Sequence, residues 1–199
     1  MPSATNNITP LEEDINTEEI SEKLNELNIP EETKQQILQN VTLIKVIVLR
    51  KQAGLPLPLG FSHNFAMYGK NEKAKAEFVH LMGQIFKSAG ILTKGHVVEV
   101  TAADLIEEKI GYTSRKTAGI IESALDGVLY IKNAHELDSS RENEKRDFNQ
   151  DALDTLWMYM DGYYSRLIVI LSAPDESLND FIGISFRPFF GYGAIYNFD

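Results

Sequence analysis

Residues 69–77 read G-K-N-E-K-A-K-A-E and lie between a short apolar stretch and a segment with helical periodicity. A chain of this organisation carries a phosphate loop, G-x-x-x-x-G-K-[ST], at this point. There small residues let backbone N–H groups converge on the phosphates, the lysine reaches the outer phosphates, and the hydroxyl holds magnesium. Glu72 and Ala74 stand at glycine positions, and Ala76 offers a metal no oxygen, although Lys75 is kept. The stretch predicts a loop that repels a triphosphate more than it attracts one.

The catalytic residues expected after a second apolar strand, residues 127–131, are replaced as well. Lys132 and Asn133 follow it, where a nucleotide hydrolase of this plan has Asp-Glu. A lysine cannot ligate magnesium, and Asn133 replaces the base that would orient the attacking water. Because phosphoryl transfer depends on positioning and charge neutralisation, we expect no hydrolysis, no catalytic residue and no bound cofactor. The predicted degenerate nucleotide site comprises Gly69, Glu72, Ala74, Lys75, Ala76, Lys132 and Asn133.

Apolar strands alternate with helical segments along the chain. Strands are expected at residues 63–68, 96–100, 127–131, 167–171 and 194–198, and helices at 72–89, 103–108, 114–125 and 148–161. Such alternation is typical of an α/β fold with a mostly parallel sheet covered by helices. Residues 136–147 carry both charge signs without an apolar period and predict an exposed loop, which is either a solvated connector or a binding site.

Acidic charge is concentrated in the first 32 residues, which hold nine acidic side chains against Lys23 alone. Two helices are expected here, one from Thr17 to about Asn28 and one from residue 31 to about Ala53. We therefore divide the chain into an acidic, partly helical N-terminal arm (1–32) and an α/β domain (33–199). The arm is interpreted as a solvated leader or as a docking arm for a basic partner surface. Nucleic acid is a poor partner for such a charge distribution.

The composition predicts a cytoplasmic domain. The 199 residues include no cysteine, which excludes disulfides and thiolate metal sites, and the four histidines show no metal-ligand spacing. The first ten residues lack the basic and apolar regions of a signal peptide, and no apolar run is long enough to span a membrane. Export by a secretion system that needs no signal peptide stays open.

Six segments within residues 43–181 resemble, in order and spacing, the AAA+ ATPases of the CbxX type. This branch contains the red-type Rubisco activases, the stage V sporulation protein K group and the type VII secretion ATPases. The matching segments are residues 49–55, 64–69, 94–105, 111–117, 124–131 and 166–171. The resemblance implies a three-layer P-loop NTPase core. It also implies a pore loop with a substrate-gripping aromatic, where this chain has Lys109, and an arginine-rich segment, of which Arg187 remains. The family's helical lid domain is not expected in this chain.

Aromatic residues crowd the segment 181–198, in more than the number that one edge strand needs for packing. We expect part of them to be exposed and to anchor a protein partner, with core packing as the competing interpretation. The predicted partner-binding residues are Phe186, Arg187, Phe189, Phe190, Tyr192 and Tyr196.

Three functional hypotheses follow from these observations. The leading one is a catalytically inactive AAA+-like domain that acts as a protein-binding adaptor, scaffold or secretion-associated module. The second is a regulatory subunit in a mixed ring with an active AAA+ paralogue. The third is a repurposed nucleotide- or anion-binding enzyme built on Lys75 and Lys132.

Overall fold

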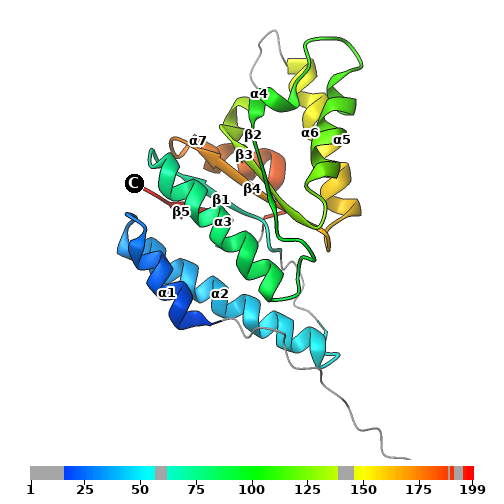
Figure 1. Cartoon of the computed structure of the whole chain (residues 1–199). Coiled ribbons are helices and arrows are strands. Elements are labelled where there is room, and N and C mark those ends of the chain that lie inside the picture. Colours follow the sequence, from blue (N-terminus) through cyan, green and yellow to red (C-terminus); the bar gives the residue numbers. More distant parts are fainter. Residues whose placement is uncertain (1–15, 57–61, 139–145, 188, 191–194) are drawn as a thin grey trace, which may run out of the picture.

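The computed structural model describes residues 16–56, 62–138, 146–187, 189–190 and 195–199 (Figure 1). The helices are α1 Thr17–Glu26, α2 Glu31–Gln52, α3 Glu72–Ser88, α4 Ala102–Leu105, α5 Thr113–Ser123, α6 Arg146–Gly162 and α7 Ser177–Phe181. A 3-10 helix, η1 Ala134–Leu137, and a π-helical turn, η2 Ile182–Phe186, accompany them. The strands are β1 Phe65–Tyr68, β2 Val97–Thr101, β3 Gly127–Lys132, β4 Leu167–Ala173 and β5 Ile195–Asn197. The predicted alternation of strands and helices is confirmed.

The five strands form one sheet in the order β2-β3-β4-β1-β5, and every pair of neighbours in it is parallel. β1 lies between β4 and β5, with Phe65 opposite Ile170 and Ala66 opposite Ile195. The central strand β4 is buried along its whole length, as a parallel strand covered on both faces must be. This placement brings the ends of β1 and β3, the two strands expected to carry the nucleotide chemistry, to the same edge of the sheet.

Helices cover both faces of the sheet and make a three-layer α/β fold (Figure 1). One buried cluster joins α1, α2 and α3 to side chains such as Val128 and Tyr130 of β3. The other joins α4, α5, α6 and α7 to the intervening residues Leu129 and Ile131. Because successive side chains of a strand point to opposite faces, these four residues divide evenly between the two cores.

The structure shows no boundary at residue 32, which lies in the first turn of α2. Ile20 and Leu24 of α1 are buried in the same cluster as α3 and the sheet, so residues 16–32 belong to the domain. The prediction of a separate arm is corrected for these residues, and residues 1–15 lie outside the described part. Asn16 caps α1 by accepting hydrogen bonds from the N–H groups of Glu18 and Glu19.

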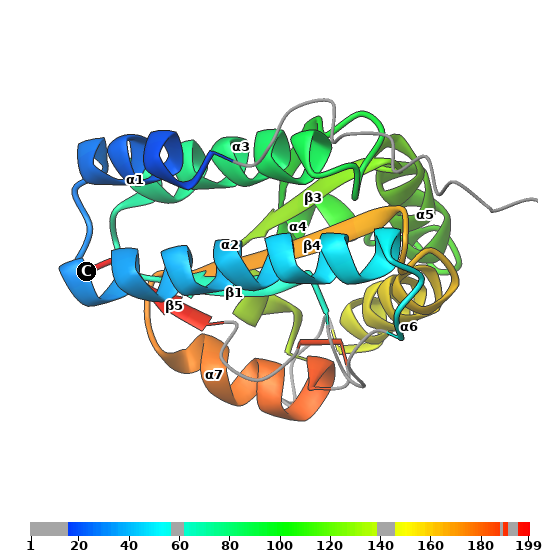
Figure 2. The same cartoon turned by 90° about the horizontal axis from the view of Figure 1, so that it is seen from below.

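Helix α2 lies along the edge strand β5 (Figure 2). Thr33 donates to the Asn197 carbonyl over 2.6 Å, and the Asn40 amide donates to the Tyr196 hydroxyl over 2.6 Å. Burial raises the pKa of the Tyr196 hydroxyl to about 12, although its bond with Asn40 opposes that rise.

The expected exposure of the C-terminal aromatics is wrong for three of them. Phe186 has no exposed surface, and Phe190 and Tyr196 are buried as well. Phe186 contacts the rings of Trp157 and Phe190 in one core. In the other, the ring of Tyr196 packs edge-on against Phe65 and Phe78. These rings are core residues because Phe186 and Phe190 belong to the buried cluster on one face of the sheet and Tyr196 to the cluster on the other face. Phe189 is partly buried, Arg187 is exposed, and Tyr192 lies outside the described residues.

Candidate functional site

The loop after β1 is shorter than a phosphate loop because the following helix begins early. It consists of residues 69–71, and α3 already starts at Glu72. Asn71 caps the helix, and its side-chain oxygen accepts a hydrogen bond from the N–H of Ala74 over 3.1 Å. The two glycine positions of the motif, now Glu72 and Ala74, therefore lie in the first helical turn, and the backbone between them cannot wrap around a phosphate.

Backbone N–H groups that would face phosphates are already bonded within the protein. Gly69 N–H donates to the Ala173 carbonyl over 3.2 Å, and Lys75 N–H donates to the Asn71 carbonyl over 3.1 Å. The N–H of Lys70 donates to the carboxylate of Asp199. A side-chain carboxylate thus occupies a donor of the loop that would otherwise be available to an anion.

Lys75 is fully buried, with no exposed surface. Its ammonium group donates to the Gly69 carbonyl over 2.6 Å and to the Ala173 carbonyl over 3.2 Å, and it pairs with Glu72 Oε1 at 2.5 Å. An ammonium has three N–H donors, so this set accounts for all of them. Glu72 was expected to repel a triphosphate. The structure shows that it also neutralises the lysine that would attract one.

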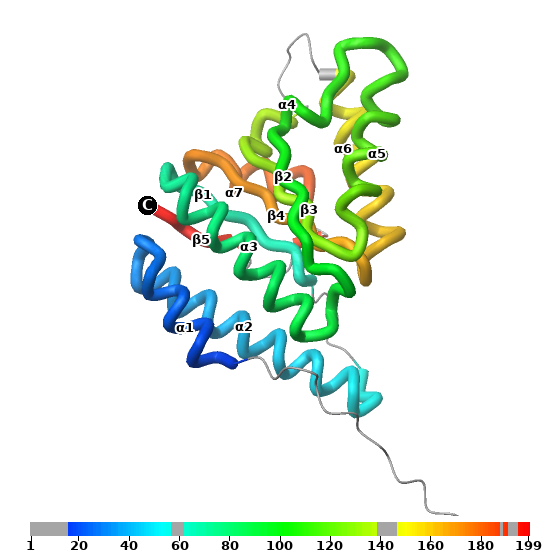
Figure 3. Tube along the Cα trace, in the orientation of Figure 1, coloured from blue at the N-terminus to red at the C-terminus, as the bar shows by residue number. Residues whose placement is uncertain are grey.

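The C-terminal segment lies directly on this loop, as the chain trace shows (Figure 3). Gly69 has φ +131°, and a Cβ at this position would come within 2.8 Å of the Phe198 carbonyl carbon. A glycine is required here for both reasons. A pocket of about 610 Å³ opens beside the loop between residues 28–30, residues 70–71 and residues 198–199. The Asn71 amide crosses to the Asn28 carbonyl over 2.9 Å and ties the α1–α2 connection to the loop.

The end of β3 contributes no ligand to the loop. Lys132 Nζ lies 3.3 Å from the Glu99 carboxylate on β2, and the same carboxylate lies 2.9 Å from His80. Asn133 adopts a left-handed conformation, with φ 54°, and leads into η1. Lys75 and Lys132 therefore have separate carboxylate partners, and the structure does not join them in one anion site.

The segment matched to a pore loop is exposed at its tip. Ile110 is 89% exposed, and the Lys109 ammonium lies 4.0 Å from the centroid of the Tyr112 ring. Lys109, which takes the position of the gripping aromatic, is therefore held over an aromatic ring three residues further on. Such a cation–π contact at an exposed site contributes about 0.5–1 kcal/mol.

The described residues include neither a membrane-spanning helix nor a metal-binding cluster. Among them, no helix has the length and apolar character that a membrane crossing requires. Within the same residues, no three His, Cys, Asp or Glu side chains gather closely enough to share a metal ion.

The three-layer fold and the parallel strand order are consistent with the α/β core of P-loop NTPases, and comparison with known proteins specifies the family. The sequence model of the ATPase family associated with various cellular activities (AAA) matches residues 66–180. The chain belongs to this AAA family, and the predicted resemblance to its CbxX-type branch is confirmed.

Relatives of this branch match most of the chain. It is 32% identical over 167 residues to stage V sporulation protein K of Bacillus subtilis, which covers 84% of this chain and 51% of the relative. It is 33% identical over 152 residues to the ESX-3 secretion system protein EccA3 of Mycobacterium tuberculosis, covering 76% of this chain and 24% of the relative. The plasmid protein CbxX of Cupriavidus necator is 32% identical over 148 residues, which cover 74% of this chain and 46% of the relative. The chain thus spans about half or less of the length of each.

Two contacts of the site could not be anticipated from the sequence. Asp199 bonds to Lys70 across 129 positions, and Asn28 bonds to Asn71 across 43. No local pattern marks these residues, because their contacts depend on β5 pairing with β1 and on α1 turning back along α2.

Proposed function

We propose that this chain is an AAA-family domain that neither binds nor hydrolyses nucleotide and that acts as a protein-binding module. The observation that carries the proposal is the state of Lys75, which is buried and has all three ammonium donors bonded to the protein's own oxygens. A lysine in this state has no donor left for a phosphate.

The free energy required to release Lys75 decides between weak and negligible nucleotide binding. Removing one partner of a buried ion pair costs about 3–5 kcal/mol. Because the Glu72 side chain is about half exposed, with 54% of its surface accessible, the pair itself contributes about 1 kcal/mol at most. The Gly69 carbonyl left without its bond adds about 1–3 kcal/mol, so releasing Lys75 costs about 2–4 kcal/mol in total. Every 1.4 kcal/mol is tenfold in affinity, so this term alone would weaken a micromolar site about 30- to 1,000-fold.

Magnesium would not offset this loss of nucleotide affinity, because both of its protein ligands are replaced. Ala76 stands where the metal-binding hydroxyl belongs, and Lys132 stands where the carboxylate belongs. Lys132 is paired with Glu99, so its charge is neutralised by a carboxylate of the neighbouring strand β2. These features support loss of turnover even if some nucleotide still enters the open pocket beside the loop.

We assign protein binding to the exposed surfaces of the domain. One relative is named as a secretion system protein and another as a sporulation protein. We infer that this cytoplasmic chain likewise works with other proteins, as an adaptor or scaffold within a larger complex.

A mixed ring with an AAA+ paralogue is the second candidate, and one observation favours it. Arg187 is exposed directly after η2, where it is free of the core that absorbs Phe186 and Phe190. An exposed arginine at this position could reach a neighbouring subunit's nucleotide. The separate ion pairs of Lys75 and Lys132 give no support to a repurposed anion-binding enzyme.

The test is a titration of the purified chain with ATP and magnesium by calorimetry, combined with a phosphate-release assay. We expect no heat of binding up to millimolar ATP and no phosphate release above the blank. A triple variant, Glu72→Gly with Ala74→Gly and Ala76→Thr, serves as the comparison, because it restores the residues that the motif requires. Micromolar affinity of the unmodified chain, lost in Lys75→Met, would refute the proposal.

A further inference from the structure

The two edges of the sheet are protected differently. At one edge, α2 lies along β5, and Thr33 donates to the Asn197 carbonyl over 2.6 Å. At the other edge, β2 pairs only with β3 and has no strand on its outer side in the described part of the chain. Figure 1 shows β2 at this border of the sheet, with α3 on one side of it and α5 on the other. An edge strand without a cover offers its backbone to another chain.

The pairing of β2 with β3 fixes which backbone groups point outward. In a parallel pair, alternate residues of a strand direct both their N–H and C=O groups to the same neighbour. The Val128 N–H donates to the His96 carbonyl over 2.8 Å, so Val98, two positions further on, faces β3 as well. Val97 and Glu99 therefore direct their N–H and C=O groups, which form the β2 edge, away from the sheet. No hydrogen bond from these four groups is found within the described residues.

The β2 edge is bounded at both ends. Thr101 is the next outward-facing residue, but its N–H donates to the Asp104 carboxylate over 2.7 Å, and α4 begins directly after it. At the other end, the N–H of Gly95 donates to the Asp126 carbonyl over 3.0 Å. The four groups between these ends are thus the ones that an added strand would meet.

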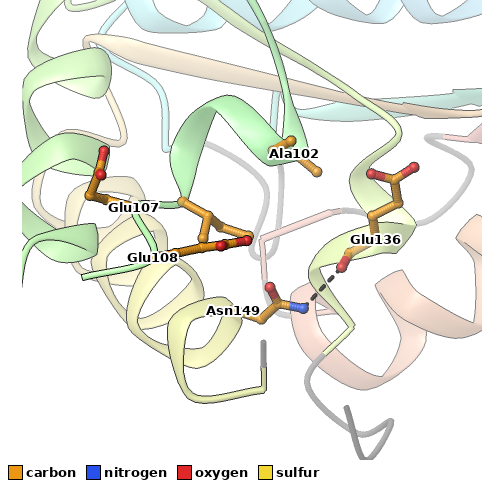
Figure 4. A pocket seen from close by; sticks show the side chains of 7 residues that line it. Ala102, Glu107, Glu108, Glu136 and Asn149 are labelled. Atoms are coloured by element: carbon orange, nitrogen blue, oxygen red, sulfur yellow. Dashed lines mark hydrogen bonds between the residues drawn. The ribbon is translucent and has the colours of Figure 1, made fainter. Parts of the chain in front are cut away.

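The pocket beyond the end of β2 is separate from this edge. Its volume is about 430 Å³, and its described lining comes from α4, the turn after it, η1 and α6 (Figure 4). Asn149, whose side-chain oxygen has no partner among the described residues, donates through its amide nitrogen to the Glu136 carbonyl over 2.9 Å. The lining includes no residue of β2, so the pocket does not interrupt the β2 edge.

The two faces of β2 differ beside the edge. Val98 and Val100 are partly buried against the cluster that includes α4 and α5. On the opposite face, the Glu99 carboxylate lies 2.9 Å from His80 and 3.3 Å from Lys132. Because successive side chains of a strand alternate between the faces, an added strand would meet apolar side chains on one face and a paired charge at the middle of the other. A strand in which apolar and polar residues alternate fits this arrangement.

The composition of β2 favours such pairing. Natural edge strands are often blunted by a proline, a bulge or an exposed lysine. β2 has none of these, and four of its five residues, Val97, Val98, Val100 and Thr101, are β-branched. A second copy of the chain is a poorer occupant than a different protein. Antiparallel pairing of β2 with itself about its centre would place the two copies of Glu99 opposite each other, and like charges in that position destabilise a strand pair.

We propose that the β2 edge binds an extended segment of a protein partner, which adds to the sheet as a strand and places its apolar side chains on the face of Val98 and Val100. The inference rests on the proposed protein-binding role and names the surface used and the form of the partner. It does not depend on the state of the phosphate loop.

Hydrogen exchange, measured by NMR on the isotope-labelled full chain, tests the proposal at single amides. The probe is a peptide of alternating threonine and valine, flanked by one lysine and one glutamate. In the free chain, the amides of Val97 and Glu99 should exchange fast, since they have no acceptor, and saturating peptide should slow them about tenfold or more. The amides of Val98 and Val100, which face β3, should exchange slowly in both states and serve as the internal reference.

Matched changes in the peptide and in the protein remove single backbone donors. A peptide with proline at its two central positions should leave Val97 and Glu99 unprotected. Val97→Pro removes one outward N–H without removing a bond to β3, and it should weaken peptide binding, followed by fluorescence anisotropy, about tenfold. Val97→Thr keeps the N–H and the β-branched shape and should change binding less than twofold. Should Val97→Pro unfold by circular dichroism, the exchange rates of the unmodified chain still decide.

Unchanged exchange at Val97 and Glu99, equal binding of the proline peptide, or no binding at millimolar peptide would overturn the assignment of the β2 edge. Protection of these amides that rises with protein concentration, without peptide, would assign the edge to a second copy and would overturn it as well. The parallel ATP titration keeps the two proposals distinguishable. ATP binding together with peptide-dependent protection would remove the nucleotide-free proposal alone, and absence of both would remove the β2 edge alone.

Discussion

Replacing Lys75 by methionine distinguishes a lysine that supports the fold from one that binds nucleotide. Methionine keeps most of the aliphatic volume of the buried side chain but removes its three donors. The Ala173 carbonyl still accepts from the Gly69 N–H, whereas the Gly69 carbonyl loses its 2.6 Å bond to the ammonium group. An unsatisfied buried acceptor costs about 1–3 kcal/mol. The Glu72 carboxylate is half exposed and can be hydrated, so the loss of its ion pair with Lys75 adds about 1 kcal/mol at most.

The total, about 2–4 kcal/mol, should lower the melting temperature by about 5–15 °C in a chain of 199 residues. Thermal unfolding followed by circular dichroism measures this, with and without millimolar ATP and magnesium. Lys73→Met is the matched control, because Lys73 is exposed on the same helical turn and pairs with Glu77 at 3.6 Å. It should shift the melting temperature by no more than about 2 °C. The reasoning is refuted if Lys75→Met melts like the unmodified chain and abolishes a protection that ATP gives to that chain.

Three further predictions concern packing, protonation and assembly. Phe190→Ala should lower the free energy of unfolding, measured with urea, by about 3–5 kcal/mol, since the ring is buried. An unchanged urea midpoint would contradict the burial of this ring. Burial, aided by nearby Lys51, lowers the pKa of His63 to about 4 from 6.5. Below pH 6.5 the folded state therefore binds fewer protons than the unfolded state, so the free energy of unfolding should fall as the pH drops from about 6.5 to about 4. Urea unfolding at each pH measures this fall, which should be smaller in His63→Gln. Light scattering should show the same mass with and without ATP, and a hexamer that forms only with nucleotide would contradict this.

The order of elements could be read from the sequence because each has its own periodicity and boundary residues. Helix α3 was predicted over residues 72–89 and spans Glu72–Ser88, and strand β5 was predicted over 194–198 and spans Ile195–Asn197. The absent glycines and hydroxyl of the loop were visible for the same reason, since a motif is a local pattern. These predictions needed no knowledge of which segments meet in space.

What the sequence could not supply was the set of partners reached across the fold. From the sequence, Phe186 and Tyr196 resemble exposed anchors. In the fold, Phe186 is buried in the cluster that includes α6 and Tyr196 in the cluster that includes α2. The acceptors of Lys75 include the Ala173 carbonyl, 98 positions away. Asn149 shows nothing unusual in its helical sequence, and its unpaired oxygen is apparent only when η1 lies beside α6.

The position of β1 between β4 and β5 also limits the order in which the chain can fold. Phe65 pairs with Ile170, and Ala66 pairs with Ile195, so both neighbours of this strand are made more than a hundred residues after it. During synthesis, an apolar strand leaves the ribosome with both of its edges unpaired. It stays so until β4 and β5 follow. Folds that depend on such distant pairings form slowly and are prone to aggregate on the way. A nascent chain stalled before residue 167 should therefore be a substrate for chaperones, and its release from them should coincide with the appearance of β4.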